Sequence, residues 1–126
     1  MHTMYIRCLA ACIGDMASGE RAEMYALRVN LTSLTVAIEL NLQMIALRLE
    51  QEAFITSHQR RSITDTTGLS FASKASSLLN CVTVKVNNDT GEKWFEKFVN
   101  IMAECTTEND LVKKLIRDLC KLHKCN

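Results

Sequence analysis

The absence of proline most constrains what this chain can fold into. Its 126 residues include no proline and only four glycines. These two residue types interrupt helices and build tight turns, so their scarcity favours helical segments joined by short links. A strand-rich domain needs many turn signals, which are rare here. The sequence therefore predicts an all-α domain.

Apolar residues recur at helical spacing along most of the chain. Leu27, Leu31 and Leu34 fall three or four residues apart, on one stripe of a predicted helix over about 20–38. Other periodic segments predict five more helices, over about 39–51, 56–63, 71–86, 91–104 and 107–122. Thr56 is the predicted N-cap of the third helix, and Asp89 with Glu92 resembles a capping box before the fifth.

Two stripes of the second predicted helix are apolar. Leu42, Ile45 and Leu49 form one, and the other consists of Leu40, Met44 and Leu47. A helix that is apolar on two sides is expected to be buried against several neighbours. The predicted fourth helix has a single apolar face, which runs from Phe71 to Val86.

The aromatic residues gather in the predicted fifth helix, although aromatics make up only 6% of the chain. Phe95 and Phe98 share a stripe with Val99, which places them in the core, and Trp94 stands beside this stripe. The predicted core consists of Leu27, Leu31, Leu34, Ile45, Leu49, Ile63, Leu78, Leu79, Phe95, Phe98, Val99 and Leu115.

Charge and hydropathy exclude several partners. The formal charge is +1 and the mean hydropathy is +0.01, so we expect no nucleic-acid binding and no membrane association. No apolar run reaches the roughly 18 residues that a membrane span requires. Residues 1–19 have a weak resemblance to a signal peptide and are expected to form an extension outside a domain that spans 20–126.

The six cysteines do not fall into a zinc-binding pattern. Cys81 and Cys120 stand among apolar helical neighbours, which favours reduced thiols that act as small hydrophobes. An even number of cysteines in a short chain leaves an alternative open, namely a secreted helical factor stapled by disulfides.

Residue types that perform catalysis are scattered. None of the three histidines (His2, His58 and His123) has a second metal-ligating residue at helical i, i+4 spacing. The four glycines are scattered and form no phosphate-binding loop. We therefore expect no enzymatic activity, no cofactor and no bound metal.

Four segments, taken in order, share a pattern of core positions: LRVNLTSLTVAI (27–38), MIALRLEQEAFITSHQRRSI (44–63), ASKASSLLNCV (72–82) and GEKWFEKFVNIM (91–102). In the last of them, Gly91 is followed after a short gap by Phe95, Phe98 and Val99, which gives Phe-x-x-Phe-aliphatic. Together these segments resemble a caspase recruitment domain (CARD), a member of the death-fold superfamily, whose most recognisable pattern is this glycine and aromatic pair. The resemblance covers about residues 20–122.

The resemblance implies a six-helix antiparallel Greek-key bundle that binds proteins and performs no catalysis. Such domains associate with another CARD-containing protein (a caspase, a kinase or an adaptor), and some form homo-oligomers or filaments. The implied role is that of a cytoplasmic adaptor or regulator in apoptotic or inflammatory signalling, within innate immunity.

The resemblance also implies that complementary charged faces make the contact. The residues that occupy these positions are Arg28, Lys74 and Lys85 on a basic face, Glu39, Glu50, Glu52 and Asp65 on an acidic face, and Arg60 and Arg61 on a secondary surface. Members of the family often carry acidic residues where this chain has the two arginines. On this hypothesis Lys74→Glu abolishes association.

Overall fold

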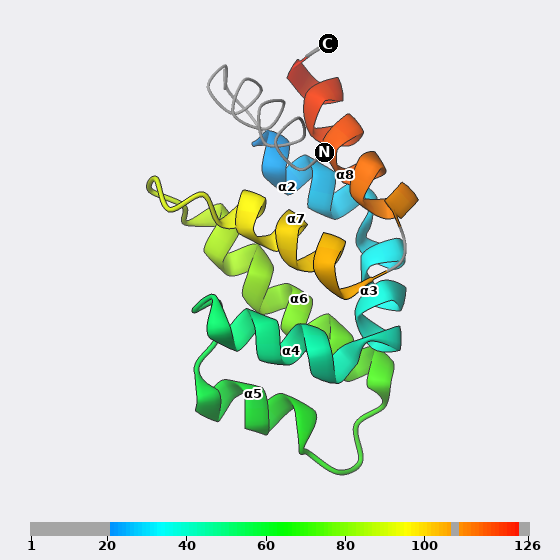
Figure 1. Cartoon of the computed structure of the whole chain (residues 1–126), viewed down its shortest axis with the longest axis vertical. Helices are drawn as coiled ribbons and strands as arrows, with labels where there is room; N and C mark the ends of the chain where they lie inside the picture. Colours follow the sequence, from blue (N-terminus) through cyan, green and yellow to red (C-terminus); the bar gives the residue numbers. More distant parts are fainter. Residues whose placement is uncertain (1–20, 107–108, 124–126) are drawn as a thin grey trace.

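The structure is a computed structural model, and it describes residues 21–106 and 109–123. The described part consists of helices, without a β-strand. These residues form seven helices, which are labelled in Figure 1. In chain order they are α2 (Ala22–Val29), α3 (Leu31–Leu40), α4 (Leu42–Gln51), α5 (Ser57–Thr64), α6 (Phe71–Asn87), α7 (Trp94–Cys105) and α8 (Asn109–His123). The predicted all-α class is confirmed.

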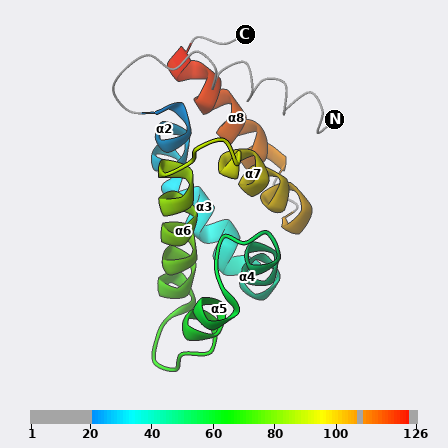
Figure 2. The same ribbon diagram turned by 90° about the vertical axis from the view of Figure 1, so that its left-hand side faces the viewer.

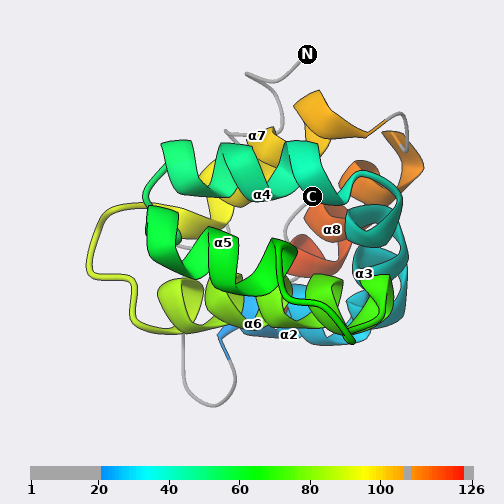
Figure 3. The same ribbon diagram turned by 90° about the horizontal axis from the view of Figure 1, so that it is seen from below.

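Helix α6, the longest helix of the described residues, contacts α2, α3, α4, α5 and α7. Figure 2 shows α2 and α6 on one side and α4, α7 and α8 on the other, with α3 running between them. Within this arrangement α2 packs against α8, and α4 packs against α7. Figure 3 shows that α5 lies between α4 and α6 at one end of the molecule.

Asparagine side chains end three of the helices. The side-chain amides of Asn30, Asn41 and Asn88 donate to the carbonyl oxygens four residues earlier, at 2.8, 3.1 and 3.0 Å. A short amide that bonds to the backbone in this way competes with continuation of the helix. The predicted helix over 20–38 is therefore divided at Asn30 into α2 and α3.

The start of α5 follows the predicted capping residue, whereas the start of α7 does not. Thr56 Oγ1 accepts from the backbone N–H of Gln59 at 3.1 Å, and Gln59 Oε1 accepts from the N–H of Thr56 at 2.8 Å, which is a complete capping box. Helix α7 begins at Trp94, three residues later than predicted, because a turn through Gly91, at a φ of 121°, precedes it.

The predicted capping box is not formed: the N-cap residue of α7 is Lys93, which makes no side-chain cap bond, and Asp89 instead holds the turn before the helix. Its carboxylate accepts from the backbone N–H groups of Gly91, Lys93 and Trp94 at 2.7, 3.3 and 2.9 Å. Glu92 accepts instead from the backbone N–H of Thr90 at 2.8 Å.

One hydrophobic core connects all the described helices except α5, which contributes Ile63 at its edge. Ten of the predicted core residues are buried, with Leu34, Ile45, Leu49, Leu78, Phe98 and Leu115 at 0% exposure. Ile63 is partly buried and packs against this core. The aromatic pair Phe95 and Phe98 is internal, as predicted.

Leu31 is not a core residue, and this part of the prediction is wrong. Its side chain is 53% exposed. The break at Asn30 restarts the helix, so the three-and-four spacing from Leu27 no longer places Leu31 on the same side, whereas Leu34 in the new helix is buried. Phe71, the first residue of α6, is also not part of the core, since its side chain is 61% exposed.

Candidate interaction surfaces

The three predicted basic residues do not form one face. Arg28 is exposed on α2, with its guanidinium carbon 5.4 Å from the centre of the Tyr25 ring. Lys74 is only 8% exposed, and its ammonium donates to the carbonyl oxygen of Thr64 at 2.8 Å. Lys85 is half-buried near the other end of α6. The expectation that Lys74 faces a partner is therefore wrong, because this ammonium is used inside the molecule to hold the end of α5 against α6.

Two of the predicted acidic residues are paired within the chain. Glu50 forms an ion pair with Arg60. Glu52 forms one with Arg48, with its Oε2 atom 3.3 Å from Nη1 of the arginine. Arg48 also pairs with Glu104 at 3.0 Å, which joins α4 to α7.

The other predicted charges lie apart from these pairs. Asp65 follows α5 and accepts a hydrogen bond from the Thr64 hydroxyl at 3.1 Å. Glu39 is half-buried on α3 and Arg61 is exposed on α5. Of the two residues of the predicted secondary surface, Arg60 is engaged in an ion pair with Glu50 and Arg61 is exposed.

An apolar surface that the charge hypothesis did not predict lies where the end of α3, the start of α4 and the start of α6 meet (Figure 1). Leu40, Met44 and Phe71 are 72%, 56% and 61% exposed, and they line a shallow depression of about 360 Å³ together with Glu39. Val36 and Leu47 are also exposed on the same two helices. We call these residues the apolar corner: Val36, Leu40, Met44, Leu47 and Phe71.

The apolar corner corrects the predicted burial of both stripes of α4. Leu42, Ile45 and Leu49 are buried as predicted, whereas Met44 and Leu47 of the second stripe are exposed. The sequence contained the signal, a second apolar stripe on one short helix. The prediction that this stripe is buried assumed that neighbouring helices cover both sides of α4, whereas the bundle leaves one side exposed.

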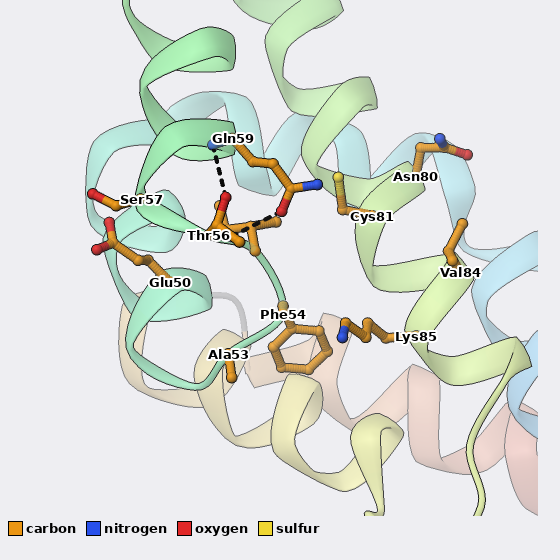
Figure 4. A pocket seen from close by; sticks show the side chains of 11 residues that line it. Glu50, Ala53, Phe54, Thr56, Ser57, Gln59, Asn80, Cys81, Val84 and Lys85 are labelled. Atoms are coloured by element: carbon orange, nitrogen blue, oxygen red, sulfur yellow. Dashed lines mark hydrogen bonds between the residues drawn. The ribbon is translucent and has the colours of Figure 1, made fainter.

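A larger hollow lies between the α4–α5 connection and α6, with a volume of about 540 Å³. Figure 4 shows Phe54 at one end and Lys85 beside it, with Cys81, Gln59 and Asn80 around the opening. Burial raises the pKa of the Cys81 thiol. The thiol therefore stays protonated at neutral pH and is a poor nucleophile.

Trp94, at the start of α7, lies next to this hollow. Its ring meets Phe54 edge-on, with the ring centres 5.0 Å apart and the planes at 64°. The ammonium groups of Lys85 and Lys97 lie 5.0 and 4.5 Å from the centre of the Trp94 ring. The cluster joins the connection after α4, the end of α6 and the start of α7.

A polar cluster is buried between α2 and α8. The amide of Asn30 donates to Asp118 at 2.8 Å, and Lys114 pairs with the same carboxylate at 3.0 Å. Asn30 and Asp118 are 2% and 6% exposed. Such a bonded pair specifies how the two helices meet, because sliding either one would leave buried polar groups without partners.

The cysteines correct the expectation of fully reduced thiols. Cys120 on α8 is disulfide-bonded, and its partner lies outside the described residues. Cys81 and Cys105 are free, as the apolar setting of Cys81 predicted. Cys120 itself is 6% exposed and belongs to the hydrophobic core.

Over residues 21–106 and 109–123, no group of three or more His, Cys, Asp or Glu side chains is placed to hold a metal ion. In the same part of the chain, no helix combines the length and hydrophobicity that crossing a membrane requires. Comparisons with protein-family models, with curated proteins and with solved structures find no match to this chain.

Proposed function

We propose that this chain is a protein-interaction module that associates with another helical domain, as the resemblance to a CARD implies. The observation that carries the proposal is the apolar corner. Folded monomers rarely expose a contiguous apolar surface unless it meets a partner. Leu40, Met44 and Phe71, all more than half exposed, border one depression.

The helix arrangement supports the kind of module proposed. When α2 and α3 are counted as two halves of one helix bent at Asn30, the described helices number six, as in the implied bundle. The first and last helices pack together through α2 and α8, and the second packs on the fifth through α4 and α7. By the same resemblance, the association belongs to apoptotic or inflammatory signalling.

Charge contributes orientation and partner choice in this proposal more than it contributes affinity. Glu39 borders the depression of the apolar corner, and Arg61 is exposed on α5. Glu50 and Glu52 are engaged with arginines of their own chain, so a partner would have to compete for them. We therefore expect apolar substitutions to weaken association more than charge reversals do.

Comparison of Leu40→Ser/Met44→Ser with Val29→Ser tests the role of the corner. All three positions are exposed, and Val29, at 39% exposure, lies on α2 outside the corner. Sedimentation equilibrium over a range of protein concentrations measures self-association, and calorimetry measures binding to CARD-containing proteins. The double variant is expected to lose association that Val29→Ser retains, while both keep the helical circular dichroism of the original chain. Equal association in the two variants would refute the proposed surface.

A second function, that of a secreted disulfide-stapled helical factor, is favoured by one observation, the disulfide at Cys120. Disulfides persist mainly in oxidising compartments. The chain has six cysteines, so one disulfide leaves at most 6 − 2 = 4 thiols to alkylate without reduction. Mass spectrometry of the alkylated protein, isolated without reductant from eukaryotic cells and from their medium, tests this. Protein confined to the cells with six alkylated thiols would exclude this function.

A further inference from the structure

Trp94 and two lysines form a cationic cluster that the proposed association through the apolar corner does not use. Trp94 is the only tryptophan of the chain and is half-buried at the start of α7. Lys85 comes from α6 and Lys97 from α7, and both ammonium groups lie within 5.0 Å of the centre of its ring. Two cations converge here from different helices.

These two lysines have no carboxylate partner in the described part of the chain, where the ion pairs engage other residues. The two carboxylates of the neighbouring turn already accept hydrogen bonds from their own chain. Asp89 accepts from the backbone N–H groups of Gly91 and Trp94, and Glu92 accepts from the backbone N–H of Thr90. The face of Trp94 offsets the charge of an ammonium group only in part. The cluster therefore presents positive charge to solvent.

Lys85 also connects the cluster to the hollow of about 540 Å³ (Figure 4). The hollow has apolar walls from Phe54, Ile55 and Val84, and polar groups at its rim from Gln59 and Asn80. Its one carboxylate, Glu50, is paired with Arg60. An apolar side chain would fit against the wall while a neighbouring anion reaches the lysines.

We propose that Lys85, Trp94 and Lys97, with the adjoining hollow, bind an acidic peptide segment of a partner protein that carries an apolar residue among its carboxylates. Charge complementarity identifies the occupant, since Lys85 lines the hollow beside its apolar wall and Lys97 lies on the same Trp94 ring, both without a carboxylate partner among the described residues. A nucleic acid fits less well, because stacking a base on Trp94 would displace the lysines from its ring. The formal charge of +1 also provides no wider attraction for phosphates.

The cluster is separate from the apolar corner. Phe71 and Lys85 stand 14 positions apart on α6, which corresponds to about 21 Å along a helix axis. Failure of one surface therefore leaves the other testable by itself. Two different binding surfaces on one molecule would let it join two partners at once.

The single tryptophan reports on the site directly. The full-length protein is titrated with an acetylated, amidated peptide Glu-Glu-Leu-Glu-Glu while Trp94 fluorescence is recorded, and the peptides Gln-Gln-Leu-Gln-Gln and Glu-Glu-Ser-Glu-Glu serve as controls. We expect a saturable change with the first peptide, weaker binding with either control, and weakening as salt is added.

Matched variants locate the binding. Each half-exposed ion pair contributes modestly, so Lys85→Met and Lys97→Met should each raise Kd about threefold and the double variant about tenfold. Lys113→Met, at an exposed position on α8, and Leu40→Ser/Met44→Ser should leave Kd unchanged. The absence of a saturable change, or the same Kd in the lysine double variant, would overturn the proposal. Tighter binding of an oligothymidylate than of the acidic peptide would also overturn it, in favour of a nucleic-acid surface.

Discussion

Lys74→Met tests whether a buried ammonium group holds the connection between α5 and α6 in place. Lys74 is 8% exposed, and Nζ donates to the carbonyl oxygen of Thr64 at 2.8 Å. Methionine keeps the apolar length of the side chain but cannot donate a hydrogen bond. The buried carbonyl of Thr64 then loses this donor.

The expected loss follows from two opposing contributions. A hydrogen bond from a charged donor contributes about 1.5–3 kcal/mol to the free energy of unfolding. Removal of the ammonium also removes the cost of burying its charge, which offsets part of that loss. We therefore expect Lys74→Met to lower the free energy of unfolding by about 1–2 kcal/mol, and Tm by about 5–10 °C for a domain of this size.

Urea unfolding followed by far-ultraviolet circular dichroism measures this change, with the exposed Lys113→Met as the matched control. Lys74→Glu should unfold at still lower urea, because it places a carboxylate beside the carbonyl of Thr64. Loss of association in Lys74→Glu would then report on stability and not on an interface. Equal unfolding midpoints for Lys74→Met, Lys113→Met and the original chain would refute this reasoning and return Lys74 to the list of partner-facing residues.

Four further predictions concern stability. Ala53→Gly should raise the free energy of unfolding by about 0.5–1 kcal/mol, measured by urea unfolding, because Ala53 adopts a φ of 67° that glycine accepts without strain. Burial raises the pKa of Asp89, but the backbone N–H donors of the turn together outweigh it, so the pKa lies below its ordinary value of 3.8. The stabilisation by this carboxylate is thus present above its ordinary pKa and disappears as the pH falls through the lower folded-state pKa. Thermal unfolding of Asp89→Asn should therefore differ from that of the original chain near neutral pH, and the difference should shrink as the pH falls below 3.8. Phe98→Ala, which empties a site at 0% exposure, should cost about 3–5 kcal/mol in the same urea assay. Reduction of the Cys120 disulfide should lower Tm in scanning calorimetry, whereas Cys120→Ser should unfold at the same temperature with and without reductant.

Hydrophobic periodicity identified the helices and most of the core because both depend on local spacing. Phe95, Phe98 and Leu115 lie inside the bundle as their stripes predict. Leu31 is exposed because a side-chain hydrogen bond of Asn30 divides the helix. A bond from a side chain to the carbonyl four residues before it has no signature in the hydrophobic pattern.

The candidate surfaces were harder to predict, because they depend on which side chains of distant helices meet. A resemblance to a family assigned Lys74 to a basic face, but only the approach of α5 to α6 brings the carbonyl of Thr64 within reach of its ammonium. The apolar residues of α4 were identifiable from sequence, but their exposure depends on where the remaining helices end. The convergence of Lys85 and Lys97 on Trp94 likewise requires the three-dimensional arrangement of α6 and α7.

The use of asparagine as a helix terminator makes the shape of this molecule unusually sensitive to single substitutions. Where proline forbids continuation of a helix, the amides of Asn30 and Asn41 only compete with it. Alanine at either position would favour one straight rod in place of two bent segments. At Asn30, one straight helix would move α2 away from Asp118. A single substitution would then separate α2 from α8, the first and last of the described helices.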